Sequence, residues 1–484
     1  MRLTRAVAAA GPGLALAPAV SPAADADLRA AHRTLFPAAE AAARGVSASS
    51  PDGTQAGYDA ARDLQEAVRA AGPVSGSCRG LERALAGYAT ARVRQAEGVD
   101  RLSRGQASTA GDRAQRLAAV ARRSAGSCPG TALVPTPRAP VIQPSSGEAT
   151  FGAVVARAPA GAERAVLVVD GQIRTQVAVR GGRARATVRG EGGRHDLELR
   201  FLRDGRVLGT IASRGVWLLP PSARATRGAV VDAARSRRVA AALAGAPRFA
   251  AAWVHQLASG RAGGVNADAA FPAASTVKLG LMATALRRLG AAPERAPLWY
   301  DVSAMVRWSS NLANNRLLAR LGAGAAADGL RRLGARASTF TGPYIVGTAR
   351  AAATVHAAPP RVSQRVTSAR DLGRMLATLH AAAAGVPAAR RGTGLTAHQA
   401  RLGLGLLLAS EQRGDNRSLL AAGAGGAPVA QKNGWLRAAR HGAGIIYSPS
   451  GPAVAVLLTY DAAGVSRTSA AGLGARVARA ARRG

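Results

Sequence analysis

The segment Asn266–Met282 reads NADAAFPAASTVKLGLM and places a lysine three positions after a serine, ahead of an apolar run. In a helix that begins near Ser275, the side chain of Lys278 lies one turn along on the same face. A serine hydroxyl becomes an effective nucleophile when an adjacent base removes its proton, and a lysine amine can be that base when its pKa is lowered. Arginine cannot, because a guanidinium keeps its proton. The segment therefore predicts a serine nucleophile with a lysine beside it.

Two other short segments offer matching side chains. Residues 309–311, SSN, open a helical pattern in which a hydroxyl can relay a proton and an amide can bind a carbonyl, although such residues also cap helices. Residues 432–435, KNGW, begin a strand-like stretch with a positive charge and a glycine that permits close approach of a substrate; a surface turn is the alternative. Of 65 basic residues only Lys278 and Lys432 are lysines, which favours one shared site.

Residues 225–484 read as a helix, strands, a long helical middle, strands and a final helix, a layout that suits an antiparallel sheet with an inserted helical lobe. This region resembles the class A β-lactamases among the penicillin-recognising serine enzymes, whose signatures are S-x-x-K, S-D-N and K-T-G. The passages RVTSARDLGRML at 365–376 and GWLRAARHGAGIIY at 434–447 also carry the resemblance. It implies a C-terminal α/β (α+β) domain of the β-lactamase and transpeptidase type.

The resemblance implies a catalytic or binding role for five side chains. Ser275 would be the acylated nucleophile, and Lys278 would accept its proton. Ser309 would relay a proton to the leaving group. Lys432 would support the site electrostatically and help to hold a substrate carboxylate, while Asn311 would bind the amide carbonyl of the substrate.

The same resemblance implies further contacts along the strand that follows Lys432. Asn433, Gly434 and Trp435 would line the substrate site. The backbone N–H groups of Ser275 and Trp435 would form the oxyanion hole. Asn315 would be a structural residue on the helix after the second signature.

The chain departs from the class A pattern within its signatures. Ser310 stands where aspartate is usual, and Asn433 stands where threonine or serine is usual; both keep polarity but change hydrogen bonding. The interval between Ser275 and Ser309 is also shorter, which indicates a trimmed helical lobe.

Class A enzymes hydrolyse their acyl-enzyme with a glutamate in a loop after the S-D-N helix, and the corresponding region has none. Between Asn311 and Ala400 the only acidic residues are Asp328 and Asp371. Asp371 follows Thr-Ser at a predicted helix start, where capping is its expected role. The loop reads GPYIVGT at 342–348, with a tyrosine and a threonine but no evident base. We therefore expect acylation to proceed and release of the acyl group to lack its usual base.

The sequence thus predicts an active-site-serine acyl hydrolase that reacts with β-lactams or a related amide. Two alternatives stay open: a D-Ala-D-Ala-type peptidase, or penicillin-binding protein, that acts on peptidoglycan peptides, and a non-catalytic wall-binding or β-lactam-sensing protein. The two lysines favour an enzyme, because a binding module would tolerate arginine at both positions. Neither a cofactor nor a metal is expected.

Residues 1–26 have the features of a signal peptide: the charged start MRLTR, an apolar stretch at 6–20, and the cleavage pattern Ala-Asp-Ala at 24–26, with cleavage near Ala23 as the alternative. No later segment forms a continuous apolar span, so no transmembrane segment is expected in the mature protein. We expect a secreted or extracytoplasmic protein, with association with the cell wall as an open alternative.

Residues 27–131 carry apolar side chains at helical spacing, which predicts a small antiparallel helical bundle. Cys78 and Cys128 each end a Gly-Ser-Cys tripeptide within it. In an oxidising compartment a disulfide between them is expected, and two unpaired buried thiols are the alternative.

Prolines mark residues 132–145 as a stiff linker. Residues 146–220 then alternate apolar and polar side chains around Asp170-Gly171 and Asp204-Gly205. Asp-Gly between such runs predicts hairpins, and several short strands predict a small β-sandwich of immunoglobulin-like type. The whole chain is therefore expected to be multidomain, with the β-lactamase-like domain at 225–484.

The net charge of +38 comes almost entirely from arginine. A genome that favours arginine codons accounts for most of it; attraction to an anionic cell-wall polymer is the alternative. Nucleic acid is not an expected partner, because the chain has export features and no nucleic-acid-binding motif.

Overall fold

The computed structural model describes residues 22–47, 51–71, 74–100, 104–128, 149–151, 153–187, 193–247, 249–291, 293, 296, 298–307, 309–340, 342, 344, 365–410 and 419–483. Most of the predicted signal peptide, the whole of the predicted linker (132–145) and Thr348 lie outside these residues. The chain divides into two compact units, Met1–Val134 and Pro135–Gly484. Within the described residues, no helix has both the length and the apolar character that crossing a membrane requires.

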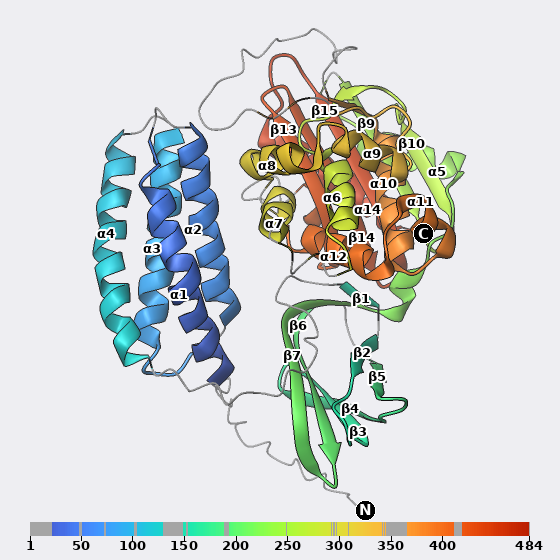
Figure 1. The fold of residues 1–484 in the computed structure, drawn as a ribbon. Coiled ribbons are helices and arrows are strands. Elements are labelled where there is room, and N and C mark those ends of the chain that lie inside the picture. Colours follow the sequence, from blue (N-terminus) through green and yellow to red (C-terminus); the bar gives the residue numbers. More distant parts are fainter. Residues whose placement is uncertain are drawn as a thin grey trace, which may run out of the picture. The chain divides into compact units, whose positions relative to one another are not determined.

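The described part of the first unit is helical (Figure 1). Its helices are α1 (Pro22–Ala43), α2 (Pro51–Ala71), α3 (Arg79–Asp100) and α4 (Arg104–Ser127). Side chains at the predicted helical spacing, among them Leu64, Leu81, Leu85 and Tyr88, are fully buried in one core. The predicted N-terminal helical part is therefore present.

A disulfide joins Cys78 to Cys128, as predicted, with a Cα–Cα distance of 4.4 Å. Cys78 precedes α3 and Cys128 follows α4, so the antiparallel packing of these helices brings the two residues together. The bridge spans 50 residues of sequence, and the chain-entropy model gives such a cross-link on the order of 4 kcal/mol.

The second unit begins with a five-stranded sheet, in the order β1-β7-β6-β3-β4, and a two-stranded sheet, β2-β5. The strands are β1 (Ala149–Phe151), β2 (Ala153–Arg157), β3 (Arg164–Val169), β4 (Gln172–Ala178), β5 (Arg183–Thr187), β6 (Gly193–Arg203) and β7 (Arg206–Leu219). Asp170-Gly171 and Asp204-Gly205 have positive φ and turn the β3-β4 and β6-β7 hairpins, as predicted. The two sheets share one apolar core. An immunoglobulin-like type of sandwich stays a prediction.

A six-stranded sheet in the order β13-β14-β15-β9-β10-β8 is the centre of the C-terminal domain. Its strands are β8 (Val230–Val231), β9 (Phe249–Gln256), β10 (Arg261–Val265), β13 (Val429–Leu436), β14 (Ala439–Ser448) and β15 (Gly451–Tyr460). Every pairing is antiparallel except that of β8 with β10. A separate short pair, β11 (Phe271–Pro272) and β12 (Val366–Thr367), lies beside the nucleophile segment.

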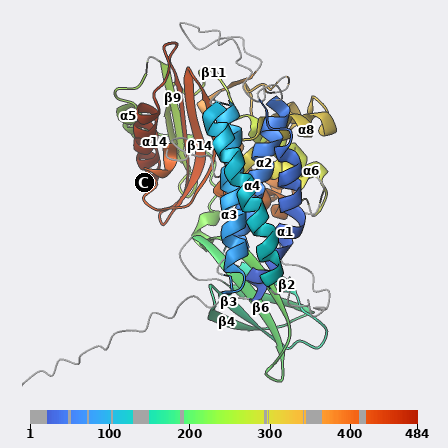
Figure 2. The same cartoon turned by 90° about the vertical axis from the view of Figure 1, so that its left-hand side faces the viewer.

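Helices cover both faces of this sheet, and Figures 1 and 2 show the layers. On one side are α5 (Ala233–Ala242) and α14 (Arg467–Arg482). The inserted helical part supplies the other side and consists of α6 (Lys278–Arg288), α7 (Trp299–Arg307), α8 (Asn311–Leu321), α9 (Ala325–Arg332), α10 (Ala369–Ala383), α11 (Pro387–Thr393) and α12 (Ala397–Leu408). Along β15, Ala455 and Leu457 belong to the core on the side of α5 and α14, whereas Val454 and Val456 belong to the core on the side of the inserted helices. The strand is apolar throughout because both of its faces are covered.

Strand β1 and the end of β7 also pack into the core of the C-terminal domain, where the side chains of Phe151 and Leu219 are buried. The ring of Phe151 meets that of His380 edge to face, with centroids 5.7 Å apart. The imidazole Nε2–H of His380 donates to the Ala225 carbonyl, and its Nδ1 accepts from the Tyr447 hydroxyl, each at 3.1 Å. Burial lowers the pKa of His380 to about 4, so it is neutral at neutral pH.

Candidate active site

Ser275 lies in the tight turn between β11 and α6. The backbone N–H and the hydroxyl of Thr276 both donate to the Ala273 carbonyl, at 3.1 and 2.7 Å, and so fix this turn. The helix begins at Lys278, slightly later than predicted, and the Lys278 N–H donates to the Ser275 carbonyl at 3.3 Å. Ser275 is half-buried at the start of a helix that is otherwise fully buried over its first two turns.

The Nζ atom of Lys278 is buried and bound by oxygen atoms of the SSN segment. Its Nζ donates to the Ser309 carbonyl and to the Asn311 Oδ1, both at 2.7 Å, and lies 3.4 Å from the Ser310 carbonyl. It also sits 4.4 Å from the ring centre of Tyr344, a cation–π distance. The structure thus joins the first two predicted motifs through one lysine.

One residue of the SSN segment caps α8, and the other two contact the lysines through their side chains. Ser310 is the N-cap of α8, and its hydroxyl accepts from the Ala313 N–H at 3.1 Å. The Ser309 hydroxyl instead accepts from Lys432 Nζ at 2.8 Å, and Asn311 faces Lys278. Helix capping, which is the alternative interpretation of this segment, therefore describes the middle residue of the three.

Lys432 is fully buried within β13. Its Nζ donates to the Ser309 hydroxyl at 2.8 Å and to the Asn433 carbonyl at 3.0 Å. Burial lowers the pKa of Lys432 to about 7. The side chain is therefore poised to gain or lose a proton near neutral pH, next to a hydroxyl that can carry one.

Gly434 brings strand β13 against the nucleophile turn. A Cβ at this position would lie 3.0 Å from the Ser275 backbone nitrogen and 3.1 Å from the Ala273 carbonyl oxygen, so any other residue would push the strand and the turn apart by a few tenths of an ångström. Asn433 is fully buried, whereas Trp435 is 56% exposed at the end of the strand. Substrate contacts by Asn433, Gly434 and Trp435 stay predictions.

Backbone strain is concentrated at this site. Among the described residues, five that are not glycine have positive φ: Asp170, Asp204, Asn266, Ala274 and Ser309. The first three are Asp or Asn, which tolerate this region. Alanine and serine do not favour it. Ala274 (φ 47°) directly precedes Ser275, and Ser309 (φ 62°) carries the hydroxyl that accepts from Lys432. Strain of this kind gathers at functional sites.

Tyr344 lies beside Lys278, in the loop after α8 in which class A enzymes carry their glutamate. The Asn315 side chain holds it from α8 by accepting from the Tyr344 N–H and donating to its carbonyl, each at 2.8 Å. The Tyr344 hydroxyl donates to the Ala274 carbonyl at 2.6 Å. Burial raises the pKa of Tyr344, and the Arg365 guanidinium, 4.0 Å above its ring, acts in the opposite direction. The phenol is neutral at neutral pH.

The two aspartates of the region have structural partners. The Asp371 carboxylate accepts from the backbone N–H groups of Arg336, Ala337 and Ser338, at 2.7 to 3.1 Å, and so anchors the turn before β12. Asp328 pairs with arginines, including Arg287 at 2.7 Å. These contacts hold both carboxylates to other parts of the fold. The N-cap of α10 is Ser368, whose hydroxyl accepts from the Asp371 N–H at 3.2 Å, so Asp371 is not the cap that was expected.

His441 is a positioning residue that the motif analysis does not single out. It is fully buried in β14, and its Nε2–H donates to the Pro272 carbonyl at 2.7 Å, directly before the nucleophile turn. Burial lowers the pKa of His441 to about 4, which keeps the ring neutral and its Nδ1 able to accept from the Thr459 N–H. A lone histidine in an apolar strand was the available signal. Among the described residues, no group of three or more His, Cys, Asp or Glu side chains is placed to hold a metal ion.

The layered sheet, the inserted helical part and a serine at the start of a buried helix define a β-lactamase-like serine hydrolase fold. A model of the β-lactamase enzyme family matches residues 234–293 and 291–483, which is more than half of the chain. The chain therefore belongs to the β-lactamase enzyme family, whose members are generally serine hydrolases.

Solved structures are similar to about half of the chain. PBP-A is 20% identical and covers 53% of this chain and 98% of its own, with a TM-score of 0.40. The β-lactamases from Desulfarculus baarsii and Sphaerobacter thermophilus are 20% and 21% identical, cover 51% and 52% of this chain and 96% of their own, and have TM-scores of 0.40. The comparison with curated proteins found no match.

Proposed function

We propose that the C-terminal domain is a serine acyl-transfer enzyme that β-lactams, or a related amide, acylate at Ser275, and that it releases the acyl group slowly. The observation that carries this proposal is the hydrogen-bonded arrangement around the nucleophile turn. Lys278 is bound to the Ser309 carbonyl, and Lys432 is bound to the Ser309 hydroxyl. The only two lysines of the chain thus meet at one residue.

Acylation begins when neutral Lys278 takes the proton of the Ser275 hydroxyl and the oxygen attacks the carbonyl carbon. The C–N bond of the amide then breaks, and the leaving nitrogen takes a proton from the Ser309 hydroxyl. Lys432 resupplies that proton along the 2.8 Å contact, and its lowered pKa suits this exchange near neutral pH. The product is an ester of Ser275.

The oxyanion would be stabilised by the backbone N–H groups of Ser275 and Trp435. The close approach of Gly434 to the Ser275 nitrogen places the strand and the nucleophile turn side by side, as such a hole requires. Because β13 is an edge strand of the sheet, a substrate with a peptide-like backbone can align along it.

Release of the acyl group requires a base that activates water, and the residue beside Lys278 is a neutral phenol. The Tyr344 hydroxyl donates a hydrogen bond to the Ala274 carbonyl, and burial raises the pKa of this hydroxyl. A phenol in this state is a poor general base at neutral pH. This observation favours a penicillin-binding protein with D-Ala-D-Ala-type peptidase activity as the second candidate function.

Intact mass spectrometry with a labelled penicillin tests the proposal, with Ser275→Ala as the control. We expect a long-lived adduct of one acyl group that the variant does not form. Rapid turnover with little adduct would identify a β-lactamase and refute slow release. Among proteins that retain the adduct, turnover of D-Ala-D-Ala peptides separates a peptidase from a sensor. Absence of both adduct and hydrolysis would refute acylation at Ser275.

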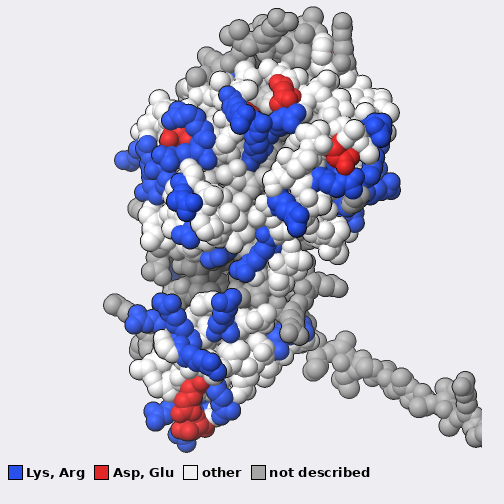
Figure 3. All heavy atoms as spheres, turned by 90° about the vertical axis from the view of Figure 1, so that its right-hand side faces the viewer, with Lys and Arg blue, Asp and Glu red and all other residues white. Residues whose placement is uncertain are grey.

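We further propose that the protein is exported and binds an anionic wall polymer. The face of the second unit in Figure 3 carries many basic side chains and few acidic ones. Such a surface attracts polyanions in a manner that salt weakens. Salt-sensitive retention on dextran sulfate, with none on neutral dextran, is the expected result; retention on both would argue against the proposal.

A further inference from the structure

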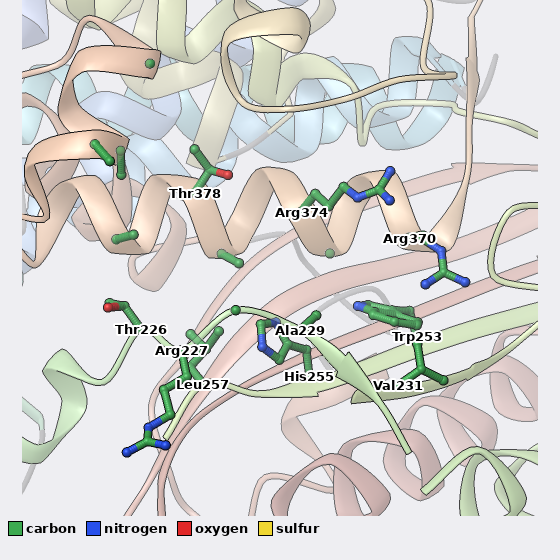
Figure 4. A pocket seen from close by; sticks show the side chains of 17 residues that line it. Thr226, Arg227, Ala229, Val231, Trp253, His255, Leu257, Arg370, Arg374 and Thr378 are labelled. Carbon is green, nitrogen blue, oxygen red and sulfur yellow. The ribbon is translucent and has the colours of Figure 1, made fainter. Parts of the chain in front are cut away.

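A cavity of about 520 Å³ lies apart from the residues of the candidate active site. It is bounded by α10, by the segment Thr226–Val231 and by strand β9 (Figure 4). Its volume falls in the range of sites that hold small organic ligands, roughly 300 to 1,000 Å³. None of the residues that line it is Ser275 or a lysine.

Apolar side chains form most of the wall of this cavity. Trp253 and Leu257 contribute from the β9 side, and Ala377 and Ala381 contribute from α10. Gly373 keeps the helix close to the indole, since a Cβ there would lie 2.3 Å from Trp253 Cδ1. These surfaces suit a short apolar tail of a ligand.

Two arginines one helical turn apart give the cavity a positive end. Arg370 and Arg374 project from α10, and Figure 4 shows Arg370 above Trp253, whose ring centre is 4.3 Å from the guanidinium. Of the described residues that line the cavity, none is acidic. Arg374 lies 3.5 Å from Asp371, but that carboxylate already accepts three backbone N–H groups. Arg370 Nε donates to the Asp268 carboxylate at 2.7 Å, a closer ion pair than that of Arg374. Arg374 is therefore the less neutralised of the two guanidinium groups at this end.

His255 provides a polar atom in the apolar wall. It is 4% exposed, lines the cavity, and within the described residues its Nε2 has no hydrogen-bond partner. Burial lowers the pKa of His255, and hydrogen bonding to the backbone of Arg227 and Gly228 acts in the opposite direction. In a neutral imidazole one ring nitrogen carries the proton and the other accepts, so with the proton on Nδ1 the Nε2 atom of His255 is an acceptor. A buried acceptor without a donor is costly, and a ligand N–H would satisfy it.

We propose that this cavity binds a small carboxylate that carries a hydrogen-bond donor and a short apolar tail, as an N-acylated amino acid does. The carboxylate pairs with Arg374, the N–H donates to His255 Nε2, and the tail lies against Trp253 and Ala377. The site is independent of acylation at Ser275.

N-hexanoylglycine, titrated by calorimetry into the full-length protein, is a suitable test ligand. Three relatives each remove one feature: N-hexanoylglycinamide lacks the charge, N-acetylglycine lacks the tail, and N-hexanoylsarcosine lacks the N–H. We expect one saturable site for N-hexanoylglycine and affinities at least about tenfold weaker for each relative, a difference of about 1.4 kcal/mol. Ser275→Ala is expected to bind the ligand as the wild type does.

Variants locate the binding within the cavity. Arg374→Gln should weaken binding of N-hexanoylglycine about tenfold and leave that of the amide unchanged. Arg331→Gln is the matched control, because it removes an Arg–Asp contact of the same 3.5 Å length outside the cavity. Ala377→Leu should weaken both ligands by filling the space, while leucine preserves the helix.

Four results would overturn the proposal: no saturable binding, equal binding of N-acetylglycine, binding that Ala377→Leu leaves intact, or loss of binding in Ser275→Ala. Equal binding of N-acetylglycine would mean that the basic surface attracts any small anion. Loss of binding in Ser275→Ala would place the ligand in the acylation site instead.

Discussion

The Lys432 ammonium and the Ser309 hydroxyl lie 2.8 Å apart, although 123 residues separate them in sequence. Ser309 presents that hydroxyl from a strained backbone with a φ of 62°, while its carbonyl binds Lys278. One serine therefore contacts both lysines through different atoms. The relay role can be tested by removing the hydroxyl alone.

Ser309→Ala should lower the rate of acylation by penicillin by about 100-fold or more, because the leaving nitrogen loses its proton donor. The rate is measured from the growth of the adduct mass. Ser310→Ala is the matched control: it removes the N-cap of α8 and should cost about 1 kcal/mol of stability with little change in acylation. Equal loss of acylation in both variants would contradict a relay role for Ser309.

Lys432 should make the stability of the protein depend on pH. Its pKa is lowered from 10.5 to about 7, so between these values the unfolded chain binds a proton that the folded protein does not. The free energy of unfolding therefore rises with pH across this window, and that contribution is lost as pH falls through about 7. In denaturant unfolding from pH 7 to 9.5, the free energy of unfolding of the wild type should rise relative to that of Lys432→Met. A constant difference would contradict a lowered pKa.

Tyr344→Glu should shorten the lifetime of the acyl-enzyme by at least about tenfold, because a carboxylate beside Lys278 can activate water. Tyr344→Phe removes only the hydroxyl bond to the Ala274 carbonyl and should leave the lifetime within about threefold of the wild type. Decay of the adduct mass after removal of free penicillin measures both. An unchanged lifetime in Tyr344→Glu would show that release is limited by something other than a missing base.

Gly434→Ala should slow acylation about tenfold, since its Cβ would displace the Ser275 N–H by a few tenths of an ångström. Gly442→Ala, on the neighbouring strand, is the control, because its Cβ meets no atom closer than 3.4 Å. Acylation kinetics and melting temperature are compared for the two. If Gly434→Ala acylates at the wild-type rate, the oxyanion hole does not depend on this approach.

The sequence was informative where the chemistry depends on residue type and order. Lysine is so rare in this chain that composition and motif order alone pair Lys278 and Lys432 with Ser275. The strands expected ahead of the final helix in residues 225–484 are likewise present, as β13, β14 and β15 before α14. The hairpins at Asp170 and Asp204 followed from the preference of Asp-Gly for positive φ.

Other features depend on contacts that no local pattern records. Ser309 and Ser310 look alike in sequence, and only the fold assigns one to the lysines and the other to the helix cap. The position of Tyr344 depends on two hydrogen bonds between its backbone and the Asn315 side chain on α8. His255 and Arg374 meet at one cavity from segments far apart in the chain, which spacing rules cannot anticipate.

The sharing of Phe151 and Leu219 between the sandwich and the C-terminal domain has a consequence for synthesis on the ribosome. Both side chains are translated long before α10 and α12, which complete the core around them. A sandwich that folds as it emerges must therefore keep an apolar edge exposed until the chain has passed Leu408. The nascent protein is expected to need protection from aggregation during that interval, and its two β-containing parts should mature together.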